Sequence, residues 1–250
     1  MAKRATSRTR KSGSGRRSKG NATSPLRRRV RGVARWISRA MFLAAGLAVA
    51  WIAIYAVVPV PRTPYMISES WRLGGVARDW VPLEEISPNL QRAVVAAEDA
   101  NFCLHWGFDM AAIRDAIADG GARGASTISQ QTVKNTFLWQ SRSWVRKALE
   151  AAITPVVELI WPKQRVLEVY LNVAEFDEGV FGAEAAARHY FGVSAADLTQ
   201  TQAARLAAIL PSPQTRSASE PSDVTRRRAG QILEGAATIR ADGRDACFAN

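Results

Sequence analysis

The sequence of 250 residues predicts a mainly α-helical protein carried on a single N-terminal membrane-spanning helix. Three observations support this prediction. A long uncharged stretch lies near the N-terminus, and the chain after it repeatedly shows helix-capping residues followed by apolar residues at helical spacing. The alternation of apolar and polar residues that is typical of β-strands is nearly absent, apart from a short strand expected near residues 72 to 81.

The uncharged stretch covers residues 40–61, and these 22 residues include no Asp, Glu, Lys or Arg. A helix of this length measures about 33 Å, which is close to the thickness of a bilayer core. A cleaved signal peptide is the alternative, but its Ala-Val-Ala cleavage site at 48–50 would fall in the middle of the stretch. We therefore predict a transmembrane signal anchor that does not join the chemistry.

Positive charge is concentrated before this anchor. Residues 1–39 hold 14 of the 34 Lys and Arg residues and no acidic residue, whereas the rest of the chain carries 20 basic and 22 acidic residues. A uniformly basic nucleic-acid binder would not divide its charge in this way, so we expect no nucleic-acid partner. The composition of the tail predicts a disordered cytoplasmic segment, and the positive-inside rule places residues 62–250 across the membrane. The tail acts most simply as a topology signal, with contact to anionic lipid headgroups or to a nucleic acid as the weaker alternative.

The exported part contains both cysteines, Cys103 and Cys247. An exported location permits a disulfide. One cysteine lies within a polar motif and the other near the end of the chain, and we predict that both are free thiols. Their spacing excludes a cysteine-based zinc site, and we predict no metal-binding residues.

Capping residues divide the exported part into helices. Most of the expected helices start at a polar N-cap or with a first-turn Pro, and two of them end at Gly or Pro. The expected helices start at Ser87-Pro88, run from about Asp109 to Gly120-Gly121, follow Ser126 and Thr127, run from Ser143 to Trp161, start with Pro162 in the first turn, run from the capping box of Thr199 and Gln202 to Pro211, and cover about 222–240.

The first candidate site is the acidic end of the helix that starts at Pro88. Glu98 follows Leu90 and Val94 at intervals of four and extends their apolar face, whereas Asp99 lies on a neighbouring face. An acid among apolar groups has its charged form disfavoured, which raises its pKa and makes it a usable proton acceptor. From this segment alone, a Glu98 that ends the helix in solvent is equally compatible.

The second candidate site lies between residues 123 and 139, where hydrogen-bonding side chains are unusually dense. Ordinary polar helix faces carry Glu, Lys and Arg, whereas this segment is rich in Ser, Thr, Gln and Asn. Hydroxyl groups and free N–H groups at the start of a helix can bind an anion. The candidate residues are Gly124, Ser126, Thr127, Ser129, Gln130, Gln131, Lys134 and Asn135.

The third candidate pattern lies in the long helix that follows. Arg146, Glu150, Thr154 and Glu158 recur every four residues, and Lys147 adjoins them. Taken alone, this spacing favours a solvent-exposed face that is stabilised by ion pairs.

Together these segments resemble the peptidoglycan glycosyltransferases of glycosyltransferase family 51, and in particular the monofunctional biosynthetic transglycosylases. Four motifs of that family occur in order. They are E-D-x-x-F-x-x-H-x-G-x-D at 98–109, G-x-S-T-I-[ST]-Q-Q-x-x-K-N at 124–135, R-K-x-x-E at 146–150, and K-x-x-[IV]-L-E-x-Y-L-N at 163–172. The resemblance covers about 85–215, and several long motifs in one order make a chance match implausible.

The resemblance implies a lysozyme-like helical domain that polymerises lipid II into glycan strands by inverting transfer, with release of undecaprenyl diphosphate, in cell-wall biogenesis. It implies that Glu98 is the base that deprotonates the acceptor hydroxyl group. Glu150 would be the second catalytic residue, orienting Arg146 or assisting the leaving group. The implied substrate-binding residues are Asp99, Phe102, His105, Gly124, Ser126, Thr127, Gln130, Gln131, Lys134, Asn135, Arg146 and Lys147.

The same resemblance implies partners and a location. The expected partners are lipid II, the growing glycan strand, the membrane and proteins of cell-wall or division synthesis. The expected location is the bacterial inner membrane, with the catalytic domain on the periplasmic side. No cofactor is required from the sequence, and the resemblance admits Mg²⁺ or Mn²⁺. Two positions depart from the family pattern, because Pro162 stands where Ser is common and Asp177 where Gly is usual, which leaves the local turn open.

Other functions remain as alternatives. Bifunctional family members carry a transpeptidase domain, but the chain contains no Ser-x-x-Lys sequence, so acyl transfer is not supported. A lytic muramidase would share the fold and a single Glu acid but would have no use for cations around a diphosphate. A membrane scaffold without activity is disfavoured because Glu98, Lys134 and Glu150 are all present.

Overall fold

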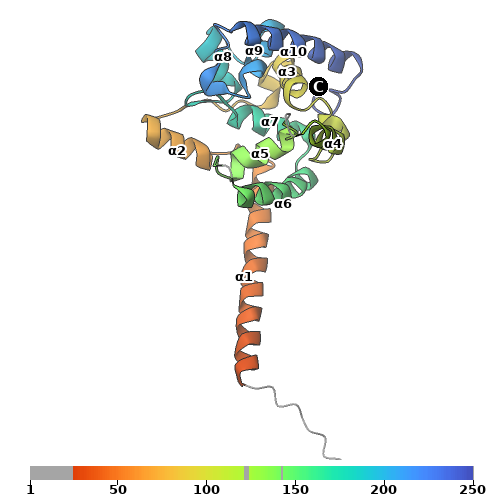
Figure 1. The fold of residues 1–250 in the computed structure, drawn as a ribbon. Coiled ribbons are helices and arrows are strands. Elements are labelled where there is room, and N and C mark those ends of the chain that lie inside the picture. The colour runs from red at the N-terminus through yellow and green to blue at the C-terminus, as the bar shows by residue number, and fades with distance from the viewer. Residues whose placement is uncertain (1–24, 121–123, 142, 250) are drawn as a thin grey trace, which may run out of the picture. The chain divides into compact units, whose positions relative to one another are not determined.

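The structure, a computed structural model, describes residues 25–120, 124–141 and 143–249 (Figure 1). It confirms the predicted fold class, since helices dominate the described chain.

The chain divides into two compact units, Met1–Leu47 and Ala48–Asn250, and the division falls inside helix α1, Pro25–Tyr55. The sequence-based boundary between anchor and exported domain, at residues 61 and 62, stays a prediction.

Helix α1 contains the apolar segment Val33–Tyr55, which is long and apolar enough to cross a membrane, with a mean hydropathy of 1.9. The prediction of a disordered tail up to residue 39 is wrong from Pro25 onward, where the chain is helical. Pro25 suits the first turn of a helix, and the Leu, Arg and Val residues after it do not interrupt one. The earlier part of the predicted tail, residues 1–24, lies outside the described residues.

The second unit includes the last turns of α1. Ile52 and Val60 are only 4% and 2% exposed within its core. The indole N–H of Trp161 donates a hydrogen bond of 2.8 Å to the carbonyl oxygen of Ile52, and Nε of Arg165 donates one of 2.9 Å to that of Tyr55. The end of the predicted anchor is therefore part of the folded core of this unit.

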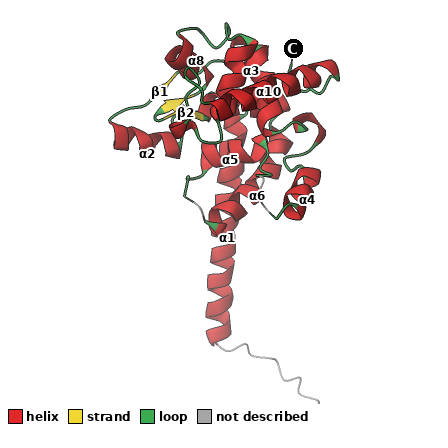
Figure 2. Cartoon of the chain, turned by 45° about the horizontal axis from the view of Figure 1, so that its top comes forward, coloured by secondary structure: helices red, strands yellow, loops and turns green. Residues whose placement is uncertain are grey.

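Helices make up most of the rest of the described chain (Figure 2). They are α2 Pro64–Leu73, α3 Pro88–Glu98, α4 Met110–Ala118, α5 Ile128–Phe137, α6 Trp144–Ile160, α7 Lys163–Val173, α8 Ala183–Phe191, α9 Gln200–Ile209 and α10 Asp223–Ala241, with short 3₁₀ turns at Leu83–Glu85, Phe102–Leu104 and Pro213–Thr215. The capping analysis did not predict α2, although Thr63 caps it and Pro64 occupies its first position.

The predicted polar starts are confirmed as caps in four helices, because each side chain accepts a hydrogen bond from a backbone N–H of the first turn. The four N-cap residues are Ser87, Thr127, Ser143 and Thr199. Ser222 also caps α10, whose start was predicted without a named cap. Pro162 lies at the N-cap position of α7, one residue earlier than predicted, and it has no side-chain hydrogen bond to offer.

A small sheet has the strand order β1–β3–β2. β1 is Ala77–Arg78, within the predicted strand region, and it pairs in parallel with β3, Val180–Phe181, whereas β2, Glu175–Asp177, pairs antiparallel with β3. The sequence did not determine the conformation of the turn near Asp177, where related proteins usually have Gly. In the structure, Gly179 makes this turn with a φ of +73°. Asp177 itself accepts a hydrogen bond of 2.8 Å from the backbone N–H of Glu178.

Helix α7 supplies a large part of the core, with Val166, Leu167, Val169, Tyr170 and Leu171 all buried. Helices α5 and α6 pack against α7, while α3, α9 and α10 pack against one another (Figure 1). The end of α3 meets the start of α5, and the candidate residues of the first two motifs gather there.

Candidate active site

Glu98 is the last residue of α3 and continues the buried face of Leu90 and Val94. Its side chain is 14% exposed, and Oε2 accepts a hydrogen bond of 2.9 Å from Nε2 of Gln131. Burial raises the pKa of Glu98, while the hydrogen bond from Gln131 and the nearby cations work in the opposite direction. Of the two interpretations left open by the sequence, the structure supports an enclosed carboxylate rather than a helix end in solvent.

Asp99 has a different position. Its Oδ1 pairs with Nε2 of His105 at 2.8 Å, and its Oδ2 accepts a hydrogen bond of 3.0 Å from the backbone N–H of Ile128. Both oxygens are therefore occupied by protein groups. Asp99 ties the loop after α3 to the first turn of α5, and it is the structural neighbour of Glu98.

The start of α5 is occupied by its own cap. Thr127 and Gln130 form a capping box, and the Thr127 hydroxyl group also donates a hydrogen bond of 2.7 Å to the carbonyl oxygen of Gly107. Gly107 has a φ of +83°, and a Cβ there would lie 2.6 Å from Cγ2 of Thr154. The helix start does bind an anion, as its sequence suggested, but in the structure that anion is the carboxylate of Asp99.

Phe102 lies in the core rather than on a surface, with 0% of the residue exposed. The ammonium group of Lys163 stands 4.4 Å from the centre of its ring and 2.8 Å from Oε1 of Glu158. The hydroxyl group of Ser129 donates a hydrogen bond to the same oxygen of Glu158. This network of Lys163, Glu158 and Ser129 packs against Phe102 of the first motif. The sequence pattern indicated no site role for Glu158.

Three cations lie close together at the junction of α5 and α6. Burial, followed by the repulsion from Arg146 and Lys147, lowers the pKa of Lys134, while Glu150 and Glu98 act against this shift. The Nε group of Arg146 is buried and has no hydrogen-bond partner within the described chain. Crowded cations with an unsatisfied donor favour the binding of an anion.

Glu150 pairs with Lys147 rather than with Arg146. The ammonium group of Lys147 also donates to the hydroxyl oxygen of Ser126 at 3.3 Å. Glu150, Thr154 and Glu158 are buried. The prediction, based on their spacing, that they lie on a solvent-exposed face is therefore wrong. Periodicity cannot distinguish a polar stripe that faces water from one that faces a polar cleft.

The remaining predicted residue of α5, Asn135, is buried and accepts a hydrogen bond of 3.0 Å from Nε2 of Gln140. The hydroxyl group of Tyr170 donates to Oε1 of Gln131 at 3.3 Å, which orients the amide group toward Glu98. Tyr170 belongs to the fourth motif, but the sequence did not indicate this contact, because the two residues are 39 positions apart.

Glu98 lines one pocket, and its hydrogen-bond partner Gln131 lines another. The first, of about 240 Å³, includes Glu98, Asp99, Asn101, Asp109, Gly124, Ser126 and Thr127 in its lining. The second, of about 200 Å³, includes Gln131, Lys134, Asn135, Gln140, Tyr170 and Glu175. Polar groups of the first two motifs therefore line two adjoining spaces.

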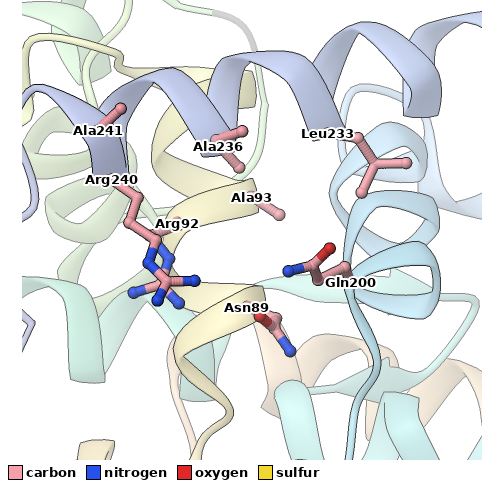
Figure 3. A pocket seen from close by; sticks show the side chains of 9 residues that line it. Asn89, Arg92, Ala93, Gln200, Leu233, Ala236, Arg240 and Ala241 are labelled. Carbon is pink, nitrogen blue, oxygen red and sulfur yellow. The ribbon is translucent and has the colours of Figure 1, made fainter.

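A third pocket, of about 330 Å³, lies between α3, α9 and α10 (Figure 3). Its lining includes Arg92, Arg240, Asn89 and Gln200 together with several alanines, and no carboxylate. None of the predicted site residues lines it, so it does not belong to the candidate active site.

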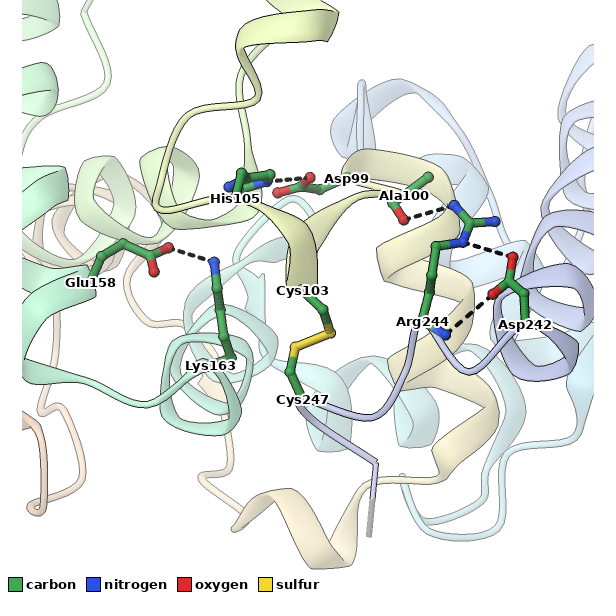
Figure 4. Close-up of a disulfide and its surroundings, with 9 residues drawn as sticks. All are labelled: Asp99, Ala100, Cys103, His105, Glu158, Lys163, Asp242, Arg244 and Cys247. Carbon is green, nitrogen blue, oxygen red and sulfur yellow. Dashed lines mark hydrogen bonds and ion pairs between the residues drawn. A yellow bond between two sulfur atoms is a disulfide. The ribbon is translucent and has the colours of Figure 1, made fainter.

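The two cysteines form a disulfide, and the prediction of free thiols is wrong (Figure 4). Cys103 lies in the turn of the first motif and Cys247 near the end of the chain, 144 positions later. The segment after α10 returns to this turn, where Arg244 donates a hydrogen bond of 3.1 Å to the carbonyl oxygen of Ala100. Spacing along the chain could not show that the two cysteines meet.

The described residues contain no group of three His, Cys, Asp or Glu side chains that could hold a metal ion. The acidic side chains at the site are instead engaged by Gln131, His105 and Lys147. The expectation that no cofactor is required stays a prediction.

A helical fold that places the enclosed carboxylate of Glu98 near Lys134, itself part of a cluster of three cations, suits an enzyme that transfers a group away from an anionic leaving group. Residues 67–237 match the family model described as Transglycosylase, and the chain belongs to this family. The expected lysozyme-like helical fold is the fold of that family.

Curated relatives extend the likeness over most of the chain. It is 71% identical over 216 residues to the biosynthetic peptidoglycan transglycosylase of Jannaschia sp. (strain CCS1), which covers 86% of this chain and 90% of the relative. It is 49% identical over 218 residues to the protein of the same name from Pseudomonas fluorescens (strain Pf0-1), covering 83% of this chain and 91% of the relative.

Proposed function

We propose that this protein is a monofunctional peptidoglycan glycosyltransferase that polymerises lipid II into glycan strands. The observation that carries the proposal is the enclosed carboxylate of Glu98 next to the cations of α5 and α6. The family match and the names of the relatives support the same activity.

The proposed reaction uses Glu98 as general base. The 4-hydroxyl oxygen of the acceptor N-acetylglucosamine attacks C1 of the donor N-acetylmuramic acid, and its proton passes to the carboxylate of Glu98. The bond between C1 and the phosphate oxygen breaks, and the electron pair leaves with undecaprenyl diphosphate. Because attack and departure take place on opposite faces of C1, the configuration inverts. A raised pKa suits Glu98 to this work near neutral pH.

The leaving diphosphate needs positive charge as the bond breaks. Lys134, Arg146 and Lys147 supply it, and their mutual repulsion in the free protein makes the binding of an anion favourable. Glu150 holds Lys147 in this cluster through their ion pair. We assign Glu150 to the placement of the cations rather than to proton transfer.

The two pockets beside the Glu98–Gln131 hydrogen bond support a reaction between two sugars. One pocket brings Glu98 together with Ser126 and Gly124, and the other brings Lys134 together with Gln131 and Tyr170. The proposed base, Glu98, therefore lines one pocket, and Lys134, a proposed leaving-group cation, lines the other. The hydrogen bond between Glu98 and Gln131 links the two linings.

We further propose that helix α1 anchors the protein in the bacterial inner membrane and that the catalytic unit faces the periplasm. The apolar segment Val33–Tyr55 and the cluster of basic residues before it support this orientation. Lipid II and the growing glycan strand are the substrates, and proteins of cell-wall or division synthesis are the proposed partners.

The experiment that tests the function is incubation of the detergent-solubilised full chain with lipid II, followed by sizing of the products. Polymer formation with release of undecaprenyl diphosphate is expected, and Glu98→Gln should abolish most of it. Consumption of finished glycan instead of lipid II would identify a lytic muramidase. A folded protein that converts neither substrate would identify a scaffold without activity.

A further inference from the structure

We propose that Arg228 of α10 is a positioning residue for Glu98. Its positive charge acts as the counterion of the buried oxygen Oε1, and so keeps the carboxylate ionised and holds its orientation. The inference rests on the proposed function and deepens the account of that site. Arg228 lies outside the four motifs, and the sequence analysis did not select it.

The two oxygens of Glu98 have different surroundings. Oε2 accepts the hydrogen bond from Gln131. Oε1 is buried and has no hydrogen-bond partner among the described residues, and Nη2 of Arg228 lies 3.7 Å from it. A separation of 3.7 Å is too long for a hydrogen bond, so Arg228 acts on Oε1 through its charge. A buried carboxylate oxygen without a donor is costly unless an opposite charge compensates it.

The contacts of Arg228 favour this role over a structural one. Within the described chain, Nη2 also donates a long hydrogen bond of 3.5 Å to the carbonyl oxygen of Ala97, and Nε is buried without a partner. A structural arginine usually has its donors satisfied by several acceptors. Both contacts of Arg228 instead go to the last two residues of α3, Ala97 and Glu98.

The approach of α10 to α3 brings the guanidinium group within reach. A Cβ atom at Gly235 would lie 3.3 Å from the Cβ atom of Ala96, so the small residue lets the two helices come close. Arg228 precedes Gly235 by seven residues, which places both on one face of α10. Figures 1 and 2 both show α10 beside α3.

Other charged and titratable groups also face Glu98, and Arg228 differs from them. The set comprises Asp99 on the adjoining residue, Asp109 across the pocket, Lys134 from α5, Tyr170 from α7 and Arg228 from α10. Lys134 also belongs to the proposed diphosphate site, so in the complex its charge would interact with the diphosphate of the substrate. Arg228 is the cation that serves the base alone.

The test uses the full chain in detergent and measures kcat/KM for lipid II as a function of pH. Arg228→Gln and Arg228→Met remove the charge, Arg228→Lys retains it, and Arg227→Gln alters the exposed neighbour as a matched control. Both neutral variants should move the rising limb of the profile to higher pH. They should lose about tenfold in kcat/KM for each pH unit of that shift, and recover the parent rate at pH values above the limb. Arg228→Lys should keep more of the parent behaviour, and Arg227→Gln should leave the profile unchanged.

A neutral variant that folds and keeps the parent limb would overturn the proposal. If neither neutral variant folds, combining each with Glu98→Gln should restore folding, because the uncompensated carboxylate is then gone; failure of that rescue would also overturn it. A ¹³C carboxyl titration of Glu98 in parent and Arg228→Met should show the same shift without any assay of activity. The titration therefore separates failure of this inference from failure of the proposed function.

Discussion

Gln131 donates a hydrogen bond of 2.9 Å from Nε2 to Oε2 of Glu98, which links the second motif to the first. Tyr170 fixes the amide by donating to its oxygen at 3.3 Å. The bond lowers the pKa of Glu98 against the effect of burial, because it stabilises the ionised form. Gln131 therefore favours the ionised form of Glu98, the form that the proposed base needs.

Replacing Gln131 with Ala should raise the pKa of Glu98 and move the rising limb of the pH–rate profile to higher pH. Hydrogen bonds to charged groups contribute about 1.5–3 kcal/mol, which corresponds to a loss of about ten- to a hundredfold in kcat/KM below the limb. Gln130→Ala is the matched control, because Gln130 caps α5 and should change thermal stability without moving the limb. Equal profiles for the parent and Gln131→Ala would contradict the role of this hydrogen bond.

Glu98→Gln should keep lipid II binding and lose polymerisation by roughly a hundredfold to ten-thousandfold, the usual contribution of a positioned base. The rising limb of the pH–rate profile should disappear with it. Binding measured by titration and turnover measured by release of undecaprenyl diphosphate separate the two effects. A folded variant that polymerises at the parent rate would transfer the role of base to another residue, with Glu150 as the next candidate.

The same substitution should also change stability with a defined sign. The folded protein binds a proton at Glu98 more tightly than the unfolded chain does, because burial raises the pKa of Glu98. The stability contributed by Glu98 is fully present below the unfolded pKa of about 4.3 and is lost as pH rises through the folded pKa. Gln does not titrate. As pH rises from the unfolded pKa through the folded pKa of Glu98, the melting temperature of Glu98→Gln should therefore rise relative to that of the parent. If the difference in melting temperature between Glu98→Gln and the parent stays constant between pH 4 and 8, burial does not destabilise the ionised form of Glu98.

Lys134→Ala should reduce kcat by roughly a hundredfold, equivalent to about 3 kcal/mol of lost charge stabilisation as the diphosphate leaves. The pKa of Lys134 is lowered by burial and by Arg146, so the parent should lose activity at a lower alkaline pH than an ordinary lysine would impose. Lys134→Arg should move that falling limb upward, because arginine keeps its charge. Normal turnover of Lys134→Ala would mean that the diphosphate is bound elsewhere.

The disulfide between Cys103 and Cys247 should contribute strongly to stability, because it closes a loop across 144 positions. The chain-entropy model gives about 5 kcal/mol for a loop of this size. The double variant Cys103→Ser, Cys247→Ser should therefore melt at a lower temperature, and a reducing agent should reproduce the effect in the parent but not in the variant. Identical melting curves for reduced and oxidised parent would refute this estimate.

Shortening the chain tests the end of α1. Removal of residues 1–64 would delete Ile52 and Val60, at about 2 kcal/mol for each buried side chain, and would leave the indole N–H of Trp161 without its acceptor. A chain that starts at Ala48 keeps these contacts. In detergent, the shorter chain should unfold at a clearly lower temperature than the chain from Ala48. Equal stability would show that the last turns of α1 do not belong to the folded core.

The local features of this protein could be predicted because they depend on neighbours along the chain. An N-cap such as Thr127 or Ser143 bonds to backbone groups two or three residues away, and the four-residue interval between Val94 and Glu98 is one turn of helix. The choice of Glu98 as the candidate base followed from this interval together with the motif.

Other features depend on which distant segments meet. The stripe of Glu150, Thr154 and Glu158 is polar whether it faces water or a cleft, and only its burial against neighbouring helices distinguishes the two. Spacing placed Glu98 on the apolar face of the helix and Asp99 on a neighbouring face, but both side chains prove to be buried at the helix end. Their partners separate them, since Asp99 is held by His105 and the start of α5.

The sequence alone was sufficient for the helical class, the apolar N-terminal helix, the starts of most other helices and the candidate base, since these rest on composition and short-range spacing. Tertiary structure decided that Cys103 meets Cys247, that the end of α1 joins the core, and that Arg228 faces Glu98. Each of these contacts joins residues more than 100 positions apart. Their proximity follows from the packing of whole helices against one another, which no local pattern encodes.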